Sequence, residues 1–537
     1  MSEDSERSDS ELMMSSRIAE GYLLLTPFLV ASVFSFPPLH LGLQTPHFYL
    51  HYHGLNDLPL QETVGSMWIS AQPLVNHMAE GVGERWREME GAMEKGDGGR
   101  RKRVGFVSSL FKPGEPHGLL MRDAIVGLDR DLWDVTVIAI GGGEIDPYIA
   151  SRADEFVGLR YFHREACETL EGLKLDMLVF LEMQNEATAH ILGYGRFAPI
   201  QALVMGSPVT SGNPGGAVDY FISFERGEPR VEEDYGEQLV MFQGTGISYP
   251  KPEFTYDEMG EGEVNDMWVE EFGLSDEFKG HRKYTCGQHI FKLHPSYDRV
   301  VVGVLSEDPV SVVLLQSSRE PGVTEIVKER MERSADRILC RGGDGGCEES
   351  EGVKRRILYL PRVDSGMFLN LLRYSDVVLH PFPFGGSKTS SDCFWVAGKL
   401  VVMGGVGFLR GRMARAYWAM VGGEIEEDVV AWDVEDYVRK AVRIGMNVDG
   451  VGGKVREVME REGKRIFDDE GVRKEWYRWM ERVTGNGGED RVSYSVDEDW
   501  EIVERLRGEW RGGEGSERCE LPNATLYELL NELYTII

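Results

Sequence analysis

The feature that constrains the fold most is a series of short apolar runs that alternates with helical stretches and then starts again. The runs are bounded by turn residues and rich in Val, Ile and Leu, which is typical of buried strands. Strands that alternate with helices predict βαβ units and a parallel sheet. The expected strands are 104–108, 134–140, 175–181, 200–205 and 217–222, then 310–315, 356–360, 376–379 and 399–403, with helices at 119–128, 323–334 and 365–374.

The length of the chain supports two domains of this kind. A chain of 537 residues is too long for one hydrophobic core. We expect an α/β fold in which two Rossmann-like, doubly wound domains face each other across a cleft, with the ligand at the carboxyl ends of the strands. The expected division is a mainly helical, partly disordered N-terminal segment at 1–100, a first domain at 101–275, a second domain at 276–480, and a C-terminal loop with helices at 481–537. The acidic and Gly-rich stretch 251–280, which spans the boundary between the two domains, is expected to be a hinge or a linker.

The net charge of −32 argues against several classes of partner. A field of this sign repels phosphate backbones and anionic lipid, so nucleic acid and membrane surfaces are not expected as partners. The apolar stretch 22–39 is interrupted by prolines and follows an acidic start, unlike a signal peptide or a membrane anchor. The six cysteines form no CxxC pair, which fits a reducing compartment and argues against a zinc site. We therefore expect a location in the cytoplasm, or in the cytoplasm and nucleus, rather than in the secretory pathway.

The segment 376–392 is the most informative about a binding site. A buried strand is followed by a proline-aromatic turn, and Gly385 and Gly386 then open a helix. Free amides at a helix start form an anion site, and glycines let a diphosphate approach the backbone. The hydroxyls of this first turn and the ammonium group of Lys388 would add donors and charge. The alternative is an ordinary capped helix, because Ser and Thr are good caps.

Three further segments carry candidate residues. Lys292 lies near the start of the second series, where a lysine suits phosphate, although a solvated surface lysine is the alternative. A Gly/Ser/Pro/Thr loop follows the expected strand 200–205. The loop after the first strand contains Glu115 and His117, either of which could act as a base, although a loop His is more often structural. The pair Asp129 and Asp131 matches a DxD metal motif, but it follows a helix rather than a strand, and we expect no metal there.

In this order, these segments resemble the catalytic region of glycosyltransferase family 41, the family of the O-linked N-acetylglucosamine transferases and SPINDLY. The resemblance covers about residues 104 to 423. A stretch just before it, TPHFYLHYHGLND at 45–57, is similar to the region ahead of the catalytic part in bacterial and algal relatives. Those relatives usually carry tetratricopeptide repeats upstream, of which 1–100 could be a remnant. The matching motifs are RVGFVSSLF at 103–111, RFAPIQ at 196–201, GSPVTSG at 206–212, the turn 288–292, LPR at 360–362, SDVVL at 375–379 and PFPFGGS at 381–387.

The resemblance implies a GT-B fold, no catalytic metal or other cofactor, and inversion at the anomeric carbon. It implies transfer of a sugar from a nucleotide donor to Ser or Thr hydroxyls of a protein or peptide. The leading donor is UDP-GlcNAc; O-fucosyl transfer from GDP-fucose is the alternative. The residues that the resemblance assigns to the nucleotide-sugar are Gln288, Lys292, Gly385, Gly386, Ser387, Lys388, Thr389, Ser390, Asp392 and Arg412, with Gly206, Pro208 and Thr210 in the sugar or acceptor loop. Among these, Lys292 would hold the diphosphate and Asp392 would meet the ribose.

The chain also departs from the family pattern. The family has a His shortly after the SSxF motif, where this chain has Gly114 or Glu115, with His117 displaced. Two further family histidines are replaced by Ser207 and Ser387, and a family lysine near residue 365 has no match. These losses leave open a catalytically degenerate protein that binds a nucleotide-sugar or a partner. The identity of the acceptor does not follow from the sequence.

Overall fold

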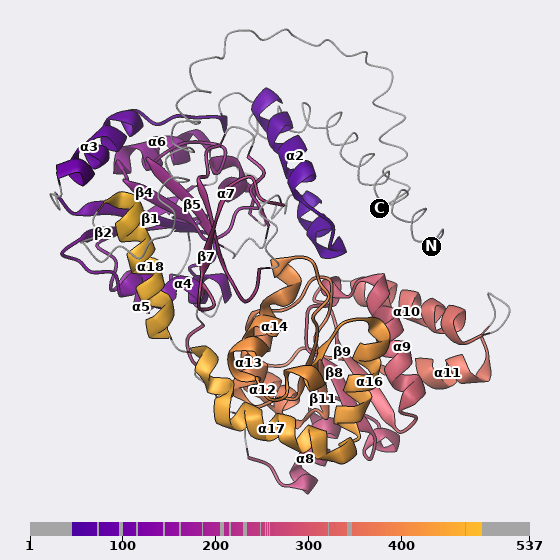
Figure 1. Cartoon of the computed structure of the whole chain (residues 1–537). Coiled ribbons are helices and arrows are strands. Elements are labelled where there is room, and N and C mark those ends of the chain that lie inside the picture. Colours follow the sequence, from indigo (N-terminus) through magenta and orange to yellow (C-terminus); the bar gives the residue numbers. More distant parts are fainter. Residues whose placement is uncertain are drawn as a thin grey trace, which may run out of the picture.

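The computed structural model describes residues 46–485 and shows two parallel sheets, each covered by helices (Figure 1). This confirms the predicted α/β fold of two doubly wound units. Within that range, the description leaves out 72–74, 96–99, 114–115, 143–144, 161–162, 185, 205–208, 214–215, 229–233, 248, 253, 255, 257, 321, 341–345 and 468. The expected terminal helices beyond residue 485, and the apolar stretch 22–39, lie outside the described residues.

The first sheet has seven parallel strands in the order β3-β2-β1-β4-β5-β6-β7. In its centre, Val104 of β1 is aligned with Met177 of β4, and both side chains are buried. Near-continuous apolar strands of this kind are expected where helices cover both faces of a sheet. The strands are β1 (Lys102–Ser108), β2 (Trp133–Ile140), β3 (Glu155–Leu159), β4 (Met177–Phe180), β5 (Ile200–Val204), β6 (Tyr220–Phe224) and β7 (Gln238–Phe242).

The second sheet has six parallel strands in the order β10-β9-β8-β11-β12-β13. Val377 of β11 is aligned with Tyr284 of β8, and both are buried at the centre of the sheet. The strands are β8 (Arg282–Cys286), β9 (Ser311–Gln316), β10 (Ile357–Leu360), β11 (Val377–Leu379), β12 (Leu400–Met403) and β13 (Val430–Ala431).

The strand order reverses at one point in each sheet. In the first sheet the chain leaves β1 toward β2 and β3, then returns to β4 on the other side of β1; in the second it does the same around β8 and β11. Ligands of doubly wound sheets bind beyond the carboxyl ends of the strands at such a reversal. The residues that follow β1, β4, β8 and β11 are therefore where the structure favours a site.

Helices connect and cover these strands. The first unit has α4 (Pro116–Val126), α5 (Pro147–Ala150), α6 (His163–Leu173) and α7 (Ala187–Leu192). The second has α8 (Glu261–Glu270), η4 (Asp276–Phe278), η5 (Ile290–Lys292), η6 (Pro295–Tyr297), α9 (Asp298–Glu307), α10 (Val323–Leu339), α11 (Glu348–Lys354), α12 (Ser365–Tyr374), α13 (Lys388–Trp395), α14 (Leu409–Val421), α15 (Glu426–Val429), α16 (Val434–Gly445), η7 (Val448–Gly450), α17 (Val451–Glu462) and η8 (Gly463–Phe467). No helix among the described residues is long and apolar enough to cross a membrane.

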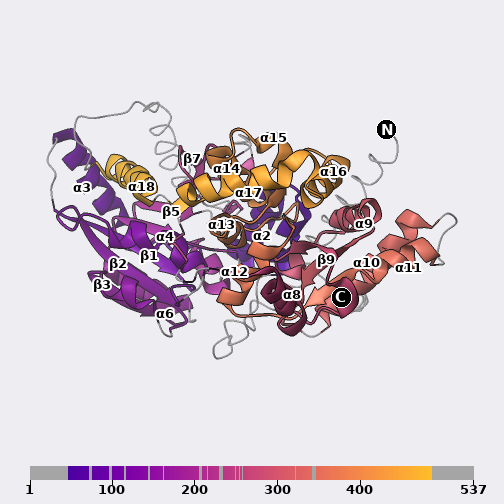
Figure 2. The same ribbon diagram turned by 90° about the horizontal axis from the view of Figure 1, so that it is seen from below.

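The last described helix returns to the first unit. Helix α18 (Asp469–Thr484) follows the second sheet in the sequence but lies beside α4 (Figures 1 and 2). The indole Nε1 of Trp476 donates to the carbonyl of Gly246 at 2.8 Å, and the Tyr477 hydroxyl donates to the carbonyl of Ala124 at 3.1 Å. This helix therefore joins the two units.

The described part of the N-terminal segment is helical and consists of η1 (Pro46–His53), α2 (Leu58–Ala71) and α3 (Val82–Lys95). Helix α3 is held on the first unit by Arg85, whose guanidinium donates to the carbonyls of Leu175 and Phe197. Helix α2 runs beside the place where the two units meet (Figure 1).

Two expectations from the sequence are wrong. The stretch 251–280 is not only a linker, because it contains α8, whose Met267 and Trp268 are buried in a small core on the second sheet. The acidic and glycine-rich composition hid the apolar face of this helix. The cysteine pattern, which fitted a reducing compartment, also differs from the structure, because Cys340 and Cys347 form a disulfide; Cys167, Cys286 and Cys393 are buried.

Candidate functional site

The centre of the second sheet brings Gln288 and Lys292 to the strand-order reversal. Gln288 lies two residues beyond the end of β8, and Lys292 ends the short turn η5. The Lys292 ammonium donates to Gln288 Oε1 at 3.1 Å, and its Nζ lies 5.3 Å from the centre of the Phe384 ring. Burial lowers the pKa of Lys292 to about 8, although the Cys286 thiol group opposes this shift. The alternative of a fully solvated surface lysine is therefore wrong.

The turn after β11 packs against this pair. A Cβ atom added to Gly386 would lie 1.8 Å from Gln288 Nε2, and one added to Gly385 would lie 2.2 Å from the His380 ring. A side chain at Gly385 would meet the buried His380 ring, and one at Gly386 would displace the end of the Gln288 side chain, so the two glycines let the turn approach its neighbours closely. Both glycine amides are already bonded: Gly385 N–H donates to the carbonyl of Arg410 at 2.9 Å, and Gly386 N–H donates to His380 Nε2 at 3.0 Å.

His380 is the buried group that orients this turn. Its side chain is 2% exposed, and burial lowers its pKa to about 4. A neutral imidazole can accept a hydrogen bond at Nε2, as the bond from Gly386 requires. His380 lies within the segment 376–392, but the sequence alone predicted no role for it. The signal that could have found it is its position as the first residue after β11.

Helix α13 begins directly after the glycines and provides the anion-binding end. Ser387 precedes its first residue without a side-chain capping bond. The first amides of a helix have no acceptor within the helix, so those of Lys388 and Thr389 can meet an anion. The side chain of Ser390 is engaged, because its hydroxyl donates to the carbonyl of Gly386 at 2.6 Å.

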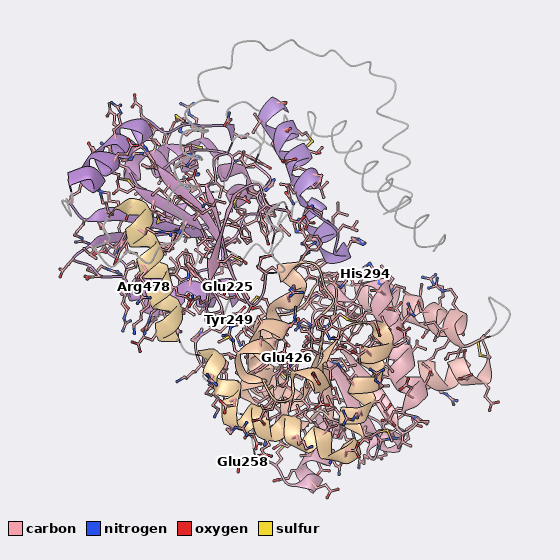
Figure 3. The ribbon with its side chains drawn as sticks, viewed as in Figure 1. Glu225, Tyr249, Glu258, His294, Glu426 and Arg478 are labelled. Atoms are coloured by element: carbon pink, nitrogen blue, oxygen red, sulfur yellow. A yellow bond between two sulfur atoms is a disulfide. The ribbon has the colours of Figure 1, made fainter. Side chains whose placement is uncertain are left out.

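The charge of Lys388 is partly balanced inside the same helix. Its ammonium forms an ion pair with Asp392, one turn later, and its Nζ lies 5.9 Å from the ring of Tyr249, which Figure 3 labels where the units meet. Burial raises the pKa of Asp392 above its ordinary value, against the effect of Lys388. Lys388 and Asp392, which the resemblance assigns to the nucleotide-sugar, therefore both lie in α13, but in this structure they form an ion pair with each other.

Arg412 lies farther along, in α14, and joins loops of both units. Its guanidinium donates to the carbonyls of Gly227, Gly404 and Val406 at 2.8 Å, 3.2 Å and 2.9 Å. Burial lowers its pKa to about 10. The structure thus gives Arg412 a bridging position between the units.

The sugar or acceptor loop of the first unit is only partly described. Thr210 donates its hydroxyl to Glu237 at 2.6 Å, and its carbonyl accepts from Gln184 Nε2 at 2.6 Å. Gly206 and Pro208 lie outside the described residues.

The candidate bases are also only partly described. Glu115 lies outside the described residues, and His117 lies in the first turn of α4, with a side chain that is not described. Helix α4 follows β1, so the backbone of His117 is on the carboxyl side of the first sheet.

The first unit has a buried carboxyl group that the sequence reasoning missed. Glu182 follows β4 and is fully buried; it accepts from the Ser108 hydroxyl at 2.6 Å and from the Ser109 amide and hydroxyl at 2.5 Å and 2.9 Å. Burial raises the pKa of Glu182 to about 7, against these three hydrogen bonds. The signal was the position of an ionisable residue close behind a central strand, two residues beyond the end of β4.

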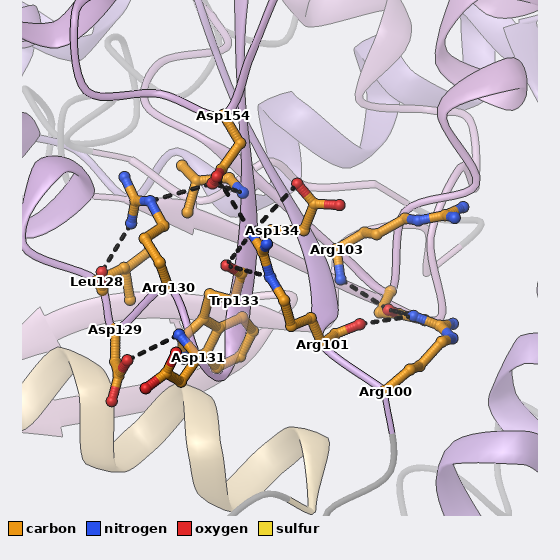
Figure 4. A network of polar contacts seen from close by, with 12 residues as sticks. Arg100, Arg101, Arg103, Leu128, Asp129, Arg130, Asp131, Trp133, Asp134 and Asp154 are labelled. Atoms are coloured by element: carbon orange, nitrogen blue, oxygen red, sulfur yellow. Dashed lines mark hydrogen bonds and ion pairs between the residues drawn. The ribbon is translucent and has the colours of Figure 1, made fainter.

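The DxD motif lies at the opposite end of the strands of the first sheet. Asp129 Oδ1 accepts from the amide of Asp131 at 2.9 Å in the turn that precedes β2, beside the arginines that start β1 (Figure 4). The motif is therefore at the amino ends of the strands, away from both strand-order reversals. Among the described residues, no three His, Cys, Asp or Glu side chains are grouped as a metal site requires.

Comparison with solved structures defines the class of fold. The O-GlcNAc transferase of Thermobaculum terrenum, solved as a point mutant, matches with a TM-score of 0.59 at 17% identity over 88% of this chain and 90% of that chain. A glycosyltransferase from Rickettsia africae matches with a TM-score of 0.46 at 10% identity, over 72% of this chain and 100% of that chain. WaaG, a glycosyltransferase involved in lipopolysaccharide biosynthesis, matches with a TM-score of 0.44 at 9% identity, over 70% of this chain and 99% of that chain.

The two doubly wound sheets and the first of these matches show that the chain has the GT-B fold of glycosyltransferases. The first of these neighbours, with a TM-score of 0.59, is an O-GlcNAc transferase. At 17% sequence identity, this similarity concerns the fold alone. No protein-family model matches the chain, and no curated protein matches its sequence.

Proposed function

We propose that this protein is a metal-independent, inverting glycosyltransferase that takes a sugar from a nucleotide diphosphate donor. The observation that supports this most is the position of Lys292. It is a partly buried ammonium group at the strand-order reversal of the second sheet, beside the turn that leads into α13. An ammonium group and a helix N-terminus together suit a diphosphate. They also supply local positive charge against the net charge of −32.

In this proposal, the acceptor hydroxyl attacks the anomeric carbon from the face opposite the diphosphate. The bond between that carbon and the diphosphate oxygen breaks, and Lys292 and the first amides of α13 stabilise the charge that develops on the leaving group. A base on the first unit takes the hydroxyl proton, with His117 and Glu115 as the candidates. The proposed acceptor is a Ser or Thr hydroxyl of a protein or peptide.

UDP-GlcNAc is the donor we favour, in line with the family resemblance and with the activity in the name of the Thermobaculum terrenum structure. GDP-fucose is the second candidate. A binding screen with both nucleotide-sugars separates the two donors.

The competing proposal is a binding protein without turnover. It is favoured by the ion pair between Lys388 and Asp392, which engages two residues that the resemblance assigns to the donor. A thermal-shift and calorimetric screen against nucleotide-sugars, followed by a donor-hydrolysis assay, separates the proposals. Binding with hydrolysis supports the transferase, and binding without hydrolysis or transfer supports the competing proposal. A screen in which no nucleotide-sugar binds contradicts the transferase and leaves only a degenerate protein that binds a partner.

A further inference from the structure

Arg410 holds a segment of the N-terminal region against the second unit. It is 4% exposed and lies in the first turn of α14. Its guanidinium donates to the carbonyl of His51 at 2.8 Å and to the carbonyl of Leu55 at 2.6 Å, and it forms an ion pair with Asp57 at 2.7 Å. One buried side chain therefore fixes both ends of the segment 51–57.

The main chain of the same residue holds the glycine turn. The carbonyl of Arg410 accepts from the amide of Gly385 at 2.9 Å. The next residue, Gly411, packs so closely that a Cβ atom there would lie 2.2 Å from the carbonyl oxygen of Pro383. Arg410 is thus bonded to the segment 51–57 through its side chain and to the candidate donor turn through its backbone.

The segment 51–57 also touches the donor turn directly. The rings of Tyr52 and Phe384 are 4.5 Å apart in an edge-to-face arrangement, and Phe384 is the ring that faces Lys292. Gly54 has a φ of +70°, and a Cβ atom there would lie 2.5 Å from Pro383. Only glycine allows this conformation together with this approach.

A second contact connects the segment to the turn that contains Lys292. The rings of His53 and His294 are 5.6 Å apart, and Figure 3 labels His294 close to the end of α2. His294 follows Lys292 by two residues. The segment therefore contacts both chain stretches that form the candidate site.

The segment and the start of α2 also reach the first unit. Asn56 Nδ2 donates to Asp234 at 2.5 Å, and a Cβ atom on Gly212 would lie 2.1 Å from the Cβ of Gln61. Gly212 belongs to the same loop as Thr210. Residues 51–61 thus contact the candidate loops of both units.

We propose that the segment 51–57 is a wall of the nucleotide-sugar site and that Arg410 is the positioning residue that fixes this wall against Phe384 and Lys292. The inference rests on the proposed function, because the wall has a role only if the site binds a nucleotide-sugar. Arg410 itself would not touch the donor; it would act through Tyr52 and through the Gly385 turn.

The experiment compares Arg410→Ala, Tyr52→Ala and the double variant with the wild-type full chain. Calorimetry with UDP and GDP and their sugars measures donor binding, and hydrogen–deuterium exchange measures the order of residues 51–57. Arg415→Ala is the matched control, because Arg415 lies on the same helix and packs over Trp432 instead.

Tyr52→Ala should weaken donor binding roughly 2- to 10-fold, as loss of an aromatic pair does. Arg410→Ala should weaken it at least as much and speed exchange in 51–57, whereas Arg415→Ala should match the wild type. The double variant should bind no more weakly than Arg410→Ala, because both changes would remove the same wall.

Faster exchange in Arg410→Ala with unchanged donor affinity would give Arg410 a structural role only and overturn the inference, while the proposed function would stand. If Arg410→Ala does not fold, Tyr52→Ala tests the inference by itself. Wild-type donor affinity in Tyr52→Ala overturns the inference that the segment 51–57 is a wall of the site. A wild-type protein that binds no nucleotide-sugar contradicts the proposed function and the inference with it.

Discussion

The ammonium group of Lys292 donates to the side-chain oxygen of Gln288, and the amide nitrogen of Gln288 lies against Gly386. A contact chain therefore runs from the end of β8, through Lys292 and Gln288, to the turn that leads into α13. A diphosphate bound at the start of α13 would meet Lys292 on one side and the helix amides on the other. The first two predictions follow from this arrangement.

Replacing Lys292 by Ala should weaken donor binding by roughly 1.5–3 kcal/mol, the range for a hydrogen bond to a charged group. The reason is that Lys292 is the ammonium we place on the diphosphate. Calorimetry with the nucleoside diphosphate measures the change, with Lys388→Ala as a comparison because Lys388 is paired with Asp392. A folded Lys292→Ala protein with wild-type affinity would remove Lys292 from the donor site.

Donor affinity should fall as the pH rises through about 8 in the wild-type protein. Burial lowers the pKa of Lys292 to about 8, so the free protein loses this positive charge above that pH, while the diphosphate binds its charged form. Calorimetry between pH 6.5 and 9.5 measures the slope. Lys292→Arg should flatten the profile, since arginine stays charged throughout this range. If Lys292→Arg keeps the wild-type slope, the pH dependence of donor affinity arises from another group.

Activity should survive an excess of EDTA, because the proposed positive charge comes from Lys292 and helix amides rather than from a metal ion. The assay is donor hydrolysis or transfer before and after chelation. Loss of activity that manganese restores would show that a metal ion takes part.

Glu115→Gln and His117→Ala should identify the base. Removing a general base lowers turnover by roughly 10²–10⁴-fold while donor affinity stays nearly unchanged. We expect the larger effect for His117, since an imidazole works near neutral pH without a large pKa shift. Single-turnover transfer and a donor titration of each variant measure the two quantities. Wild-type rates in both variants would show that this loop carries no base.

Glu182→Gln should change how the free energy of unfolding depends on pH. Burial raises the pKa of Glu182 from 4.5 to about 7, so its protonated form is favoured in the folded state. The stabilisation that the protonated Glu182 carboxyl group gives the folded state is complete below pH 4.5 and is lost as the pH rises through 7. The variant should therefore gain up to roughly 3 kcal/mol relative to the wild type between pH 4.5 and 7.

Urea unfolding at several pH values in that window measures this gain. Exposed Glu62→Gln is the control and should follow the wild type. A constant difference between Glu182→Gln and the wild type would mean that the Glu182 carboxyl group does not titrate in this window.

Most central strands could be predicted from the sequence, and the edge strands could not. The expected run 175–181 contains β4, and 376–379 contains β11, because strands covered on both faces are continuously apolar. Strands β3 and β7 were missed, since they lie at the edge of the sheet and are only partly buried. Strand β8 is central, but it begins with Arg282 and Lys283. Arg282 forms an ion pair with Asp308, and the ammonium of Lys283 donates a hydrogen bond to the carbonyl of Lys279.

The sequence by itself determined the repeated strand and helix pattern, the turn through Gly385 and Gly386, and the candidates Gln288 and Lys292. The pattern and the glycine turn follow from apolar periodicity and from the backbone freedom of glycine, which act over a few residues. Lys292 was a candidate through its place near the start of the second series, and Gln288 through the family resemblance alone. Only the tertiary structure decided which polar groups are already bonded within the protein. It bonds the amide of Gly386 to His380, pairs Lys388 with Asp392, and buries Glu182 against two serines.

The tertiary structure also decided the place of the N-terminal segment. Arg410 and His51 are separated by 359 positions, yet they are hydrogen-bonded in the interior. A buried guanidinium must bind carbonyls or carboxylates, but local sequence does not say which ones, since any distant acceptor of the right geometry satisfies it. That choice depends on how the two sheets and the N-terminal segment pack together, and it is made by contacts far apart in the chain.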